Sequence, residues 1–202
     1  MTHHTGAIRL LTEADFAPAV QVQARAFFTD PLWVYLIPND RQREKLLVPF
    51  FEPVFRYAIR GRLCYGTTSP LEGVAIWSKP GENAPLFGLS TLRLFFTPLI
   101  LPILRSIRVV SRFDRMQKIY APAPHFYLNT ISVLPQAQGK GLASALIRPF
   151  LAQADQQVAG TYTETMTPSN VPLYQHFGFA VMEQDRVPGT DLSIWALYRP
   201  PQ

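Results

Sequence analysis

Apolar residues recur at strand spacing and then at helix spacing from the start of the chain. The apolar run Ile8–Leu11 predicts a short strand. Thr12 follows as a helix cap, because its side chain can accept a backbone N–H, and the helix is expected to reach about Phe27. Asp30 precedes a proline, and a residue in that position avoids the helical region, so we expect a break there.

A second helical pattern starts near Asp40 and presents a wide apolar face. The residues on that face are Leu46, Leu47, Phe50, Phe51, Val54, Phe55 and Ala58. Pro49 and Pro53 lie inside the pattern, and a proline removes a hydrogen bond from a helix interior. We therefore expect a kink or two short pieces rather than one straight helix.

The middle of the chain predicts a hairpin followed by a long helical segment. Arg62–Gly66 and Gly73–Ser78 have strand character, and a polar turn joins them. From Phe87 to about Tyr120 the spacing of apolar residues is helical again. This segment is expected to be an insertion before the next strand.

The last part of the chain alternates strands and helices. The expected strands are Phe126–Val133, Thr161–Met166, Phe179–Asp185 and Ser193–Tyr198, the last two forming a closing hairpin. A helix opens near Gly139 with Leu142, Leu146, Phe150 and Ala154 on one face, and a short helix covers Val171–Phe177. Residues 1–202 are thus expected to form a single α/β domain with a helical insertion at about 87–120.

Composition supports a packed domain and an anionic ligand. Hydrophobic residues make up 48% of the 202 residues and charged residues 16%, which is enough apolar material for a core. The net charge of +5 suits cofactor phosphates as well as nucleic acid. Zinc-ligand spacing, an RNA-binding aromatic signature and a long basic arm are absent from the sequence, so we expect neither a metal nor a nucleic-acid partner.

The sequence favours a cytoplasmic location. The one cysteine, Cys64, excludes an intramolecular disulfide and lies in an apolar run where a buried thiol is expected. The first residues lack the pattern of a signal peptide. The apolar stretch Leu89–Val110 is interrupted by three arginines and two prolines, so we expect no integral membrane segment.

Four arginines follow one another at helical spacing in the insertion: Arg105, Arg108, Arg112 and Arg115. A stripe of this kind is usually a solvated face. The alternative is a basic wall that faces an acidic acceptor, a partner or a membrane surface.

The segment between the strand Phe126–Val133 and the following helix is the strongest chemical signal. The first N–H groups of a helix have no internal partner, and the helix dipole favours negative charge there. Gly139 and Gly141 let the backbone approach a ligand closely, since neither carries a Cβ atom. The segment therefore predicts a phosphate or pyrophosphate site.

Two well-known phosphate-binding motifs fit this segment poorly. A nucleoside-triphosphate loop needs a Gly-Lys-Ser/Thr ending that the sequence lacks. For a dinucleotide fold, Gly139 and Gly141 are placed well and Glu164 follows at about the right distance, but the third position is Ser144 instead of glycine or alanine. The unit also starts near residue 126, which leaves no room for the further parallel strands of such a fold.

A third interpretation accounts for more residues. Gln136, Gly139 and Gly141 match the Gln/Arg-x-x-Gly-x-Gly/Ala signature of the GNAT superfamily of acyl-CoA N-acyltransferases, which the chain resembles. The run Asn170–Phe179 is similar to the second family signature, an Asn and a Tyr followed by Gly-Phe. The last third also resembles the antibiotic-type (puromycin-like) acetyltransferases, through His125–Leu128, Thr163–Thr165 and that same run.

The resemblance implies a fold and a cosubstrate, acetyl-CoA. The implied fold is a mixed, mostly antiparallel sheet with helices on both faces, in which the fourth and fifth strands splay apart to admit the pantetheine arm. Backbone groups of Ile131 and Val133 would bind the pantetheine amides, and the backbone from Gln138 to Ser144 would take the pyrophosphate. The cofactor-binding residues implied are Ile131, Ser132, Val133, Gln138, Gly139, Lys140, Gly141, Leu142, Ala143, Ser144, Asn170 and Tyr174.

The resemblance also implies direct attack of a neutral amine on the thioester. Tyr174 is the expected general acid, because a phenol with a pKa near 10 is protonated at neutral pH and can hydrogen-bond a developing thiolate. Asn170 lies four residues earlier on the same helical face and is expected to cap the helix. The base is left open between Glu164, His125 and an ordered water, with Glu164 preferred.

The sequence therefore predicts an acetyl-CoA-dependent N-acetyltransferase that acts on a primary amine of a small molecule. The alternatives are a non-catalytic acyl-CoA sensor and an enzyme that acetylates a protein or peptide amine. Aromatic residues at Phe27–Phe28, Trp33–Tyr35 and Phe95–Phe96 are candidates for an acceptor pocket, although such residues usually belong to a core. The chain is expected to be a monomer or homodimer.

Overall fold

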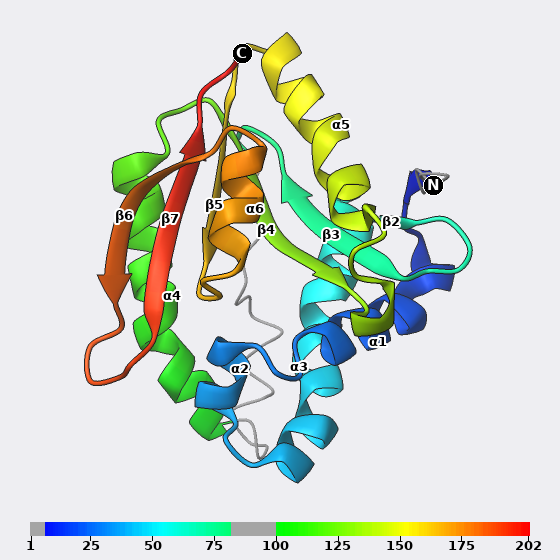
Figure 1. Ribbon diagram of the computed structural model, residues 1–202. Coiled ribbons are helices and arrows are strands. Elements are labelled where there is room, and N and C mark those ends of the chain that lie inside the picture. The colour runs from blue at the N-terminus through cyan, green and yellow to red at the C-terminus, as the bar shows by residue number, and fades with distance from the viewer. Residues whose placement is uncertain (1–6, 82–99) are drawn as a thin grey trace.

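The computed structural model describes residues 7–81 and 100–202, which fold around one seven-stranded sheet (Figure 1). The strands are β1 (Ile8–Leu10), β2 (Cys64–Thr67), β3 (Gly73–Ser78), β4 (His125–Val133), β5 (Gly160–Thr165), β6 (Ala180–Arg186) and β7 (Ser193–Arg199). The α-helices are α1 (Phe16–Ala26), α2 (Pro31–Leu36), α3 (Asp40–Arg60), α4 (Ile100–Tyr120), α5 (Leu142–Gln156) and α6 (Asn170–His176).

The sheet is mixed and mostly antiparallel, as predicted. Its strand order is β1-β2-β3-β4-β5-β7-β6, and only β4 and β5 pair in parallel. Among the described residues, 3₁₀ turns at Glu13–Asp15 and Pro135–Ala137 precede α1 and α5. The order of elements agrees with the α/β fold expected from the sequence.

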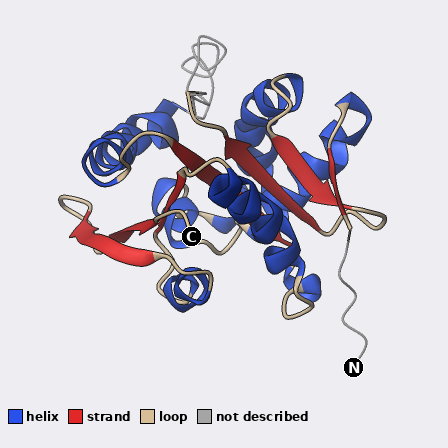
Figure 2. Ribbon diagram, turned by 90° about the horizontal axis from the view of Figure 1, so that it is seen from above, coloured by secondary structure: helices blue, strands red, loops and turns tan. Residues whose placement is uncertain are grey.

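Helices cover both faces of the sheet (Figure 2). Alternate residues of a strand point to opposite faces. On β3, Val74 and Ile76 are buried against α1 and α3, whereas Ala75 and Trp77 are buried against α5. On β5, Tyr162 is buried in a third cluster with Met116 of α4. Residues that pair directly across β3 and β4 lie on the same face of the sheet, so the clusters on the two strands can be compared. Helices α1, α3 and α4 therefore cover one face, and α5 and α6 cover the other.

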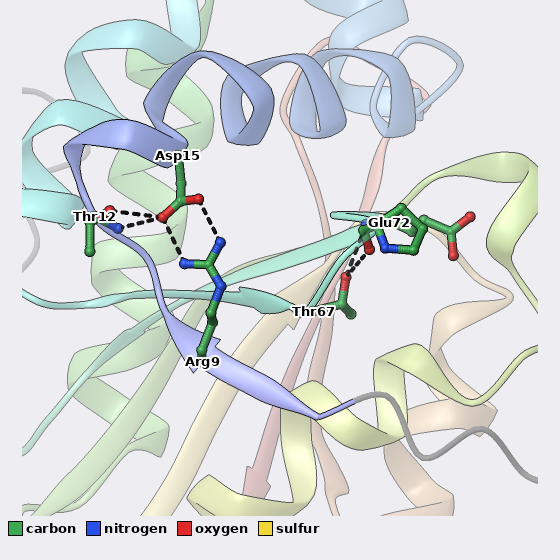
Figure 3. Close-up of polar contacts among 6 residues, drawn as sticks. Arg9, Thr12, Asp15, Thr67 and Glu72 are labelled. Atoms are coloured by element: carbon green, nitrogen blue, oxygen red, sulfur yellow. Dashed lines mark hydrogen bonds and ion pairs between the residues drawn. The ribbon is translucent and has the colours of Figure 1, made fainter.

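The start of α1 is fixed by polar contacts around Thr12 (Figure 3). The carboxylate of Asp15 accepts the Thr12 backbone N–H at 2.9 Å, and the Arg9 guanidinium donates to both Asp15 oxygens at 2.7 and 2.6 Å. The hydrogen bond from Arg9 is the main reason why the pKa of Asp15 is lowered. Thr12 occupies the predicted cap position of the 3₁₀ turn that leads into α1, but its hydroxyl donates to Asp15 Oδ2 at 3.0 Å instead of accepting a backbone N–H.

Two elements differ from the sequence-based expectation. The break after Asp30 is followed at once by the short helix α2, with Pro31 in its first turn and the Asp30 side chain accepting the Leu32 N–H at 3.0 Å. The region from Asp40 is one uninterrupted helix, α3, so the division into two pieces is wrong. Its aromatic face is buried, and that burial outweighs the hydrogen bonds lost at the two prolines.

The remaining expectations concern the middle of the chain. Cys64 is fully buried, as predicted, and burial raises the pKa of its thiol. The expected start of the insertion at Phe87 lies outside the described residues, which resume with α4 at Ile100. Within residues 7–81 and 100–202, none of the helices has the length and apolar character needed to cross a membrane.

Candidate active site

The central strands β4 and β5 are paired only over a short stretch and then diverge. β4 and β5 are paired from His125 with Gly160 to Tyr127 with Tyr162. Just beyond, the Thr163 hydroxyl donates to the Leu128 carbonyl at 3.0 Å, where a backbone ladder would otherwise continue. Strand β4 runs on to Val133 with β3 on its other side. The sheet therefore opens between β4 and β5, as expected from the sequence.

A glycine turn lies at the open end of β4. Gly139 and Gly141 have φ angles of +77° and +82°, in the left-handed region that favours glycine, and α5 starts at the next residue. A Cβ atom at either glycine would meet nothing within 4 Å. The positive φ angles are therefore one reason for glycine at these two positions. The sequence suggested a second reason, the close approach of a ligand to the backbone. The turn presents the first N–H groups of the 15-residue helix α5 to the opening.

A cleft of about 560 Å³ connects the opening with this turn. Four parts of the chain line it: the end of α1 and the turn after it, the end of β4, the glycine turn with the first turn of α5, and the β5–α6 turn with α6. The expected cofactor residues that line it are Ile131, Ser132, Val133, Gln138, Gly139, Gly141, Leu142, Ala143, Ser144, Asn170 and Tyr174. Residues far apart in sequence thus meet in one groove.

Lys140 is the expected cofactor residue that is not among those lining the cleft. Its side chain is half-exposed, and its ammonium lies 3.6 Å from a carboxylate oxygen of Glu72. Glu72 follows the β2 turn, where the Thr67 hydroxyl accepts its backbone N–H at 2.9 Å (Figure 3). The structure thus holds Lys140 beside an acid at the edge of the glycine turn.

Tyr174 reaches the cleft from α6 and is almost fully buried, with 3% of its surface exposed. Its ring packs against Phe179 with 5.7 Å between centroids. Burial raises the pKa of the phenol to about 12, Thr163 acts in the opposite direction, and the nearby charge of Glu164 raises it further. The phenol is therefore a hydrogen-bond donor throughout the neutral pH range.

Asn170 lines the cleft but does not cap α6 as predicted. Asn170 is the first residue of the helix, and Ser169 occupies the cap position without a side-chain hydrogen bond. The Asn170 amide instead donates to the Thr165 hydroxyl at 3.4 Å. The side chain therefore connects α6 to the end of β5, because Ser169 adopts a helical backbone that does not present a cap.

Glu164 lies on the opposite face of the sheet from Tyr174. Its Oε2 atom accepts the Tyr127 hydroxyl at 2.7 Å, and Tyr127 packs beside Tyr162 on the face that α4 covers. Burial raises the pKa of Glu164 to about 8, Tyr127 and Tyr162 lower it, and the charge of Asp114 raises it. A carboxylate of this kind changes its protonation near neutral pH, as a general base requires.

His125, like Glu164, is not among the residues that line the cleft. It starts β4 and pairs with Gly160, whereas Glu164 lies four residues further along β5. At about 3.3 Å per residue, this places the two side chains roughly 13 Å apart along the strands. Burial lowers the pKa of His125, and its Nε2 atom lies 3.1 Å from the Gln117 amide of α4.

The structure adds residues that the sequence did not single out. Asp30 lines the cleft, and its Oδ2 atom accepts the Thr167 hydroxyl at 3.0 Å, which ties the turn after α1 to the turn after β5. Burial raises the pKa of Asp30. The sequence showed only an aspartate before a proline, since its partner lies 137 positions away.

Arg148 is exposed and contacts two residues of the cleft. Its Nε donates to the Ser144 hydroxyl at 2.8 Å, and its guanidinium lies 5.3 Å from the centre of the Phe177 ring. Both contacts are with residues that line the cleft. The spacing of Ser144 and Arg148 on α5 was the available sequence signal, because residues four apart are neighbours on a helix.

The arginine stripe on α4 is neither a solvated face nor a free basic wall. Arg105 donates to the Leu36 carbonyl at 3.2 Å, Arg112 lies 3.1 Å from Asp185, and Arg115 lies 2.7 Å from Glu183. Arg108 is exposed. Both interpretations of the stripe are therefore corrected: three of its members hold α4 against α2 and β6.

The aromatic segments proposed for an acceptor pocket fall in different places. Phe27 lines the cleft, whereas Trp33 is buried in the core, edge-on to Phe50 and Phe51. Phe95 and Phe96 lie outside the described residues. Over the described ranges, no group of three or more His, Cys, Asp or Glu side chains is placed to hold a metal ion.

Comparisons with known proteins agree with this arrangement. Residues 117–189 match a family model described as an acetyltransferase (GNAT) domain. An uncharacterised N-acetyltransferase of Schizosaccharomyces pombe is 30% identical over 187 residues, which cover 84% of this chain and 72% of the relative.

Solved structures share the fold. A structure described as histone acetyltransferase HPA2 and related acetyltransferase, from Corynebacterium glutamicum, has a TM-score of 0.66 at 24% identity and covers 98% of this chain and 97% of its own. A mosquito arylalkylamine N-acetyltransferase-like protein has a TM-score of 0.63 at 12% identity, covering 96% and 99%. At such identities the likeness concerns the fold.

Proposed function

The chain belongs to the GNAT family of acetyltransferases, and we propose that it transfers the acetyl group of acetyl-CoA to a primary amine of a small molecule by direct attack. The observation that carries the proposal is the cleft itself. One groove joins the parting of β4 and β5, the N-terminus of α5 and the phenol of Tyr174. The opening would give a strand edge that can hydrogen-bond the amides of pantetheine, the N-terminus of α5 would bind a pyrophosphate, and the phenol would donate a proton.

Acetyl-CoA is the cosubstrate for which these features fit. The free edge of β4 at Ile131 and Val133 would bind the pantetheine amides as an added strand would. The N–H groups from Gln138 to Ser144 would take the pyrophosphate at the helix N-terminus. Arg148 at the rim would supply a cation for the remaining phosphate. We also propose that residues 1–202 work as one domain.

Tyr174 would act on the leaving group. The amine nitrogen attacks the thioester carbon, the C–N bond forms and the C–S bond breaks, and the phenol gives its proton to the departing sulfur. A phenol with a raised pKa stays protonated until the thiolate develops, and the low exposure of Tyr174 keeps water from replacing it. The nearly apolar surroundings strengthen that hydrogen bond.

Glu164 would receive the proton of the amine. Its pKa of about 8 makes it a stronger base than an ordinary carboxylate. It lies two residues beyond the last β4–β5 pair, on the face opposite Tyr174, and acid and base would then approach the thioester from two sides. His125 lies too far along β4 for this role, and we assign the base to Glu164.

The amine is proposed to belong to a small molecule. The mosquito neighbour is named for arylalkylamines, which are small molecules, and the Corynebacterium neighbour is named for histones, which are proteins. The fold therefore occurs in proteins named for either class of acceptor. We propose the former, and the hydrogen bond between Thr167 and Asp30, which links two walls of the cleft, supports a small acceptor. A peptide amine remains an outcome of the test.

The test is release of free thiol from acetyl-CoA in the presence of aminoglycosides, nucleoside antibiotics, polyamines, amino acids, arylalkylamines and peptides. We expect thiol release with at least one small primary amine and an equal amount of N-acetylated product. Thiol release with peptides alone would show that the acceptor is a peptide amine and not a small molecule. Binding of acetyl-CoA without turnover across the panel would favour a sensor domain instead.

A further inference from the structure

A β-bulge places one asparagine at the parting of the strands. Ile76 of β3 pairs with Thr130 and Trp77 pairs with Leu128, so Asn129 has no partner on β3. A bulge of this kind turns a side chain out of the regular alternation and often occurs beside active sites. Asn129 stays on the face of Tyr127, beside Ser78, and the alternation of the residues after it is shifted by one position.

The Asn129 amide is fixed in one orientation. Its Nδ2 atom donates to the Ser78 hydroxyl at 2.8 Å and to the Tyr127 carbonyl at 3.1 Å. A backbone carbonyl only accepts, so the NH₂ group and not the oxygen must face Tyr127. The Oδ1 atom consequently points away from both partners. It is buried and accepts no hydrogen bond from the described residues.

Glu164 repeats this pattern on the neighbouring strand. Its Oε2 atom accepts the Tyr127 hydroxyl, while its Oε1 atom is buried and has no hydrogen-bond partner among the described residues. The Tyr162 hydroxyl lies close enough to lower the pKa of Glu164, but the two groups do not have the geometry of a hydrogen bond. One oxygen of each side chain is thus held and the other is left open.

The two open oxygens lie at the same level and on the same face of the sheet. Tyr127 pairs with Tyr162, and Asn129 and Glu164 each follow two residues later. Asn129 donates to the backbone carbonyl of Tyr127 and Glu164 accepts from its hydroxyl, and Ser78, which holds Asn129, is the β3 partner of Tyr127. Neighbouring strands are about 4.8 Å apart where they pair, and these two begin to part at this level.

Buried acceptors without a donor are uncommon and costly, and two at one place call for a ligand with two donors. A neutral primary amine has two N–H groups and one lone pair. Resting on the function proposed above, we propose that Asn129 Oδ1 and Glu164 Oε1 together bind the amino group of the acceptor, and that Asn129 makes the enzyme specific for primary amines.

This binding mode also orients the reaction. With one N–H donated to each oxygen, the lone pair of the nitrogen is left free to face the opening between β4 and β5, where the thioester would lie. As the C–N bond forms and the C–S bond breaks, the N–H proton held by Glu164 passes to Oε1, and Tyr174 protonates the leaving sulfur. Asn129 keeps its hydrogen bond to the product amide nitrogen until release.

The mode separates amine classes. A secondary amine has one N–H and an alcohol has one O–H, so each leaves one of the two oxygens buried without a donor. A lost hydrogen bond of this kind changes a rate by roughly 5- to 150-fold. The wild type should therefore acetylate a primary amine faster than its N-methyl derivative by a factor in this range.

The experiment measures kcat/KM for the fastest primary amine of the panel above and for its N-methyl derivative, in the wild type, Asn129→Ala and Ser78→Ala. We expect Asn129→Ala to slow the primary amine by at least about 5-fold and to bring the ratio of the two amines close to one. KM for acetyl-CoA should stay unchanged. Ser78→Ala removes a neighbour of the Nδ2 atom only, and should preserve the ratio.

Each result has a distinct meaning. A wild type that acetylates both amines equally overturns the inference without any variant, even if Asn129→Ala does not fold. An unchanged ratio in a folded Asn129→Ala protein overturns it as well, and the two oxygens then hold water. Failure of every amine in the wild type would instead remove the proposed function, which is visible in the same assay.

Discussion

At the scale of single residues, the proposed general acid is the phenol of Tyr174. Tyr174→Phe keeps the ring that packs against Phe179 and removes only the proton donor. We expect kcat to fall by about 100-fold or more, since general acid catalysis typically contributes that much, with KM for acetyl-CoA little changed. Steady-state kinetics of thiol release measure both. A variant with wild-type kcat would show that the sulfur leaves without help from this phenol.

Glu164 gives a prediction about pH. Its base form is the ionised carboxylate, and because its pKa is raised to about 8, that form is lost as the pH falls below 8. Values of kcat/KM, corrected for the fraction of neutral amine, should rise through about pH 8 and then level off. Glu164→Gln should be slow and should lack this rise. The groups that face Glu164 are Asp114, Tyr127 and Tyr162, and a rise that persists in the variant would show that Glu164 is not the base.

The same pKa shift predicts an effect on stability. An acid whose folded pKa is raised binds its proton more tightly when folded, so the folded state loses stability as the pH rises from about 4.5 to about 8. Glu164→Gln removes this loss. Melting temperatures at pH 5 and pH 9 should therefore differ less in the variant than in the wild type. An equal difference would mean that Glu164 titrates normally.

At the scale of elements, the glycine turn before α5 can be tested by a matched pair of variants. Gly141 and Gly189 both have positive φ angles and both have open space where a Cβ would stand. Alanine at either position should cost about 1–2 kcal/mol, which lowers the melting temperature by about 2–8 °C. Only Gly141→Ala should weaken acetyl-CoA binding, because Gly141 lines the cleft and Gly189 lies in the β6–β7 turn. Equal acetyl-CoA binding by both variants would show that the turn before α5 does not bind the pyrophosphate.

The elements also show what the sequence was able to predict. Strand and helix spacing located nearly all of the elements, because each has one buried face with the matching period, as Leu142, Leu146, Phe150 and Ala154 show on α5. Helix α2 was missed because it is a single short piece with little periodicity. The prolines of α3 were given too much weight, since local propensity yields to a buried aromatic face.

The site divides in the same way. Most residues of the two family signatures line the cleft, because a local turn and a helix N-terminus are encoded locally, whereas Lys140 does not line it and Asn170 does not cap α6. Asp30, Asn129 and Arg148 were not singled out, since their significance comes from contacts such as the one between Asp30 and Thr167 across 137 positions. Pairing of Arg112 and Arg115 with the acids of β6 was equally invisible, and the stripe looked free for that reason.

At the scale of the whole molecule, acetyl-CoA should stabilise the fold. The cleft joins α1, β4, α5 and α6, so a ligand that fills it binds only the folded protein. At a concentration 100 times its Kd, acetyl-CoA should add about 2.7 kcal/mol, a rise of roughly 5–10 °C in melting temperature. Thermal unfolding with and without the ligand measures this. Dephosphorylated pantetheine derivatives should give a smaller rise in melting temperature. An identical rise would show that the turn before α5 does not bind the phosphates.

The most direct measurement is a crystal structure of the protein with coenzyme A bound. We expect the pantetheine arm between β4 and β5, the pyrophosphate on the N–H groups of Gly139–Ser144, and the thiol sulfur within hydrogen-bonding distance of the Tyr174 hydroxyl. Coenzyme A bound elsewhere, or with its thiol directed away from Tyr174, would contradict this expectation.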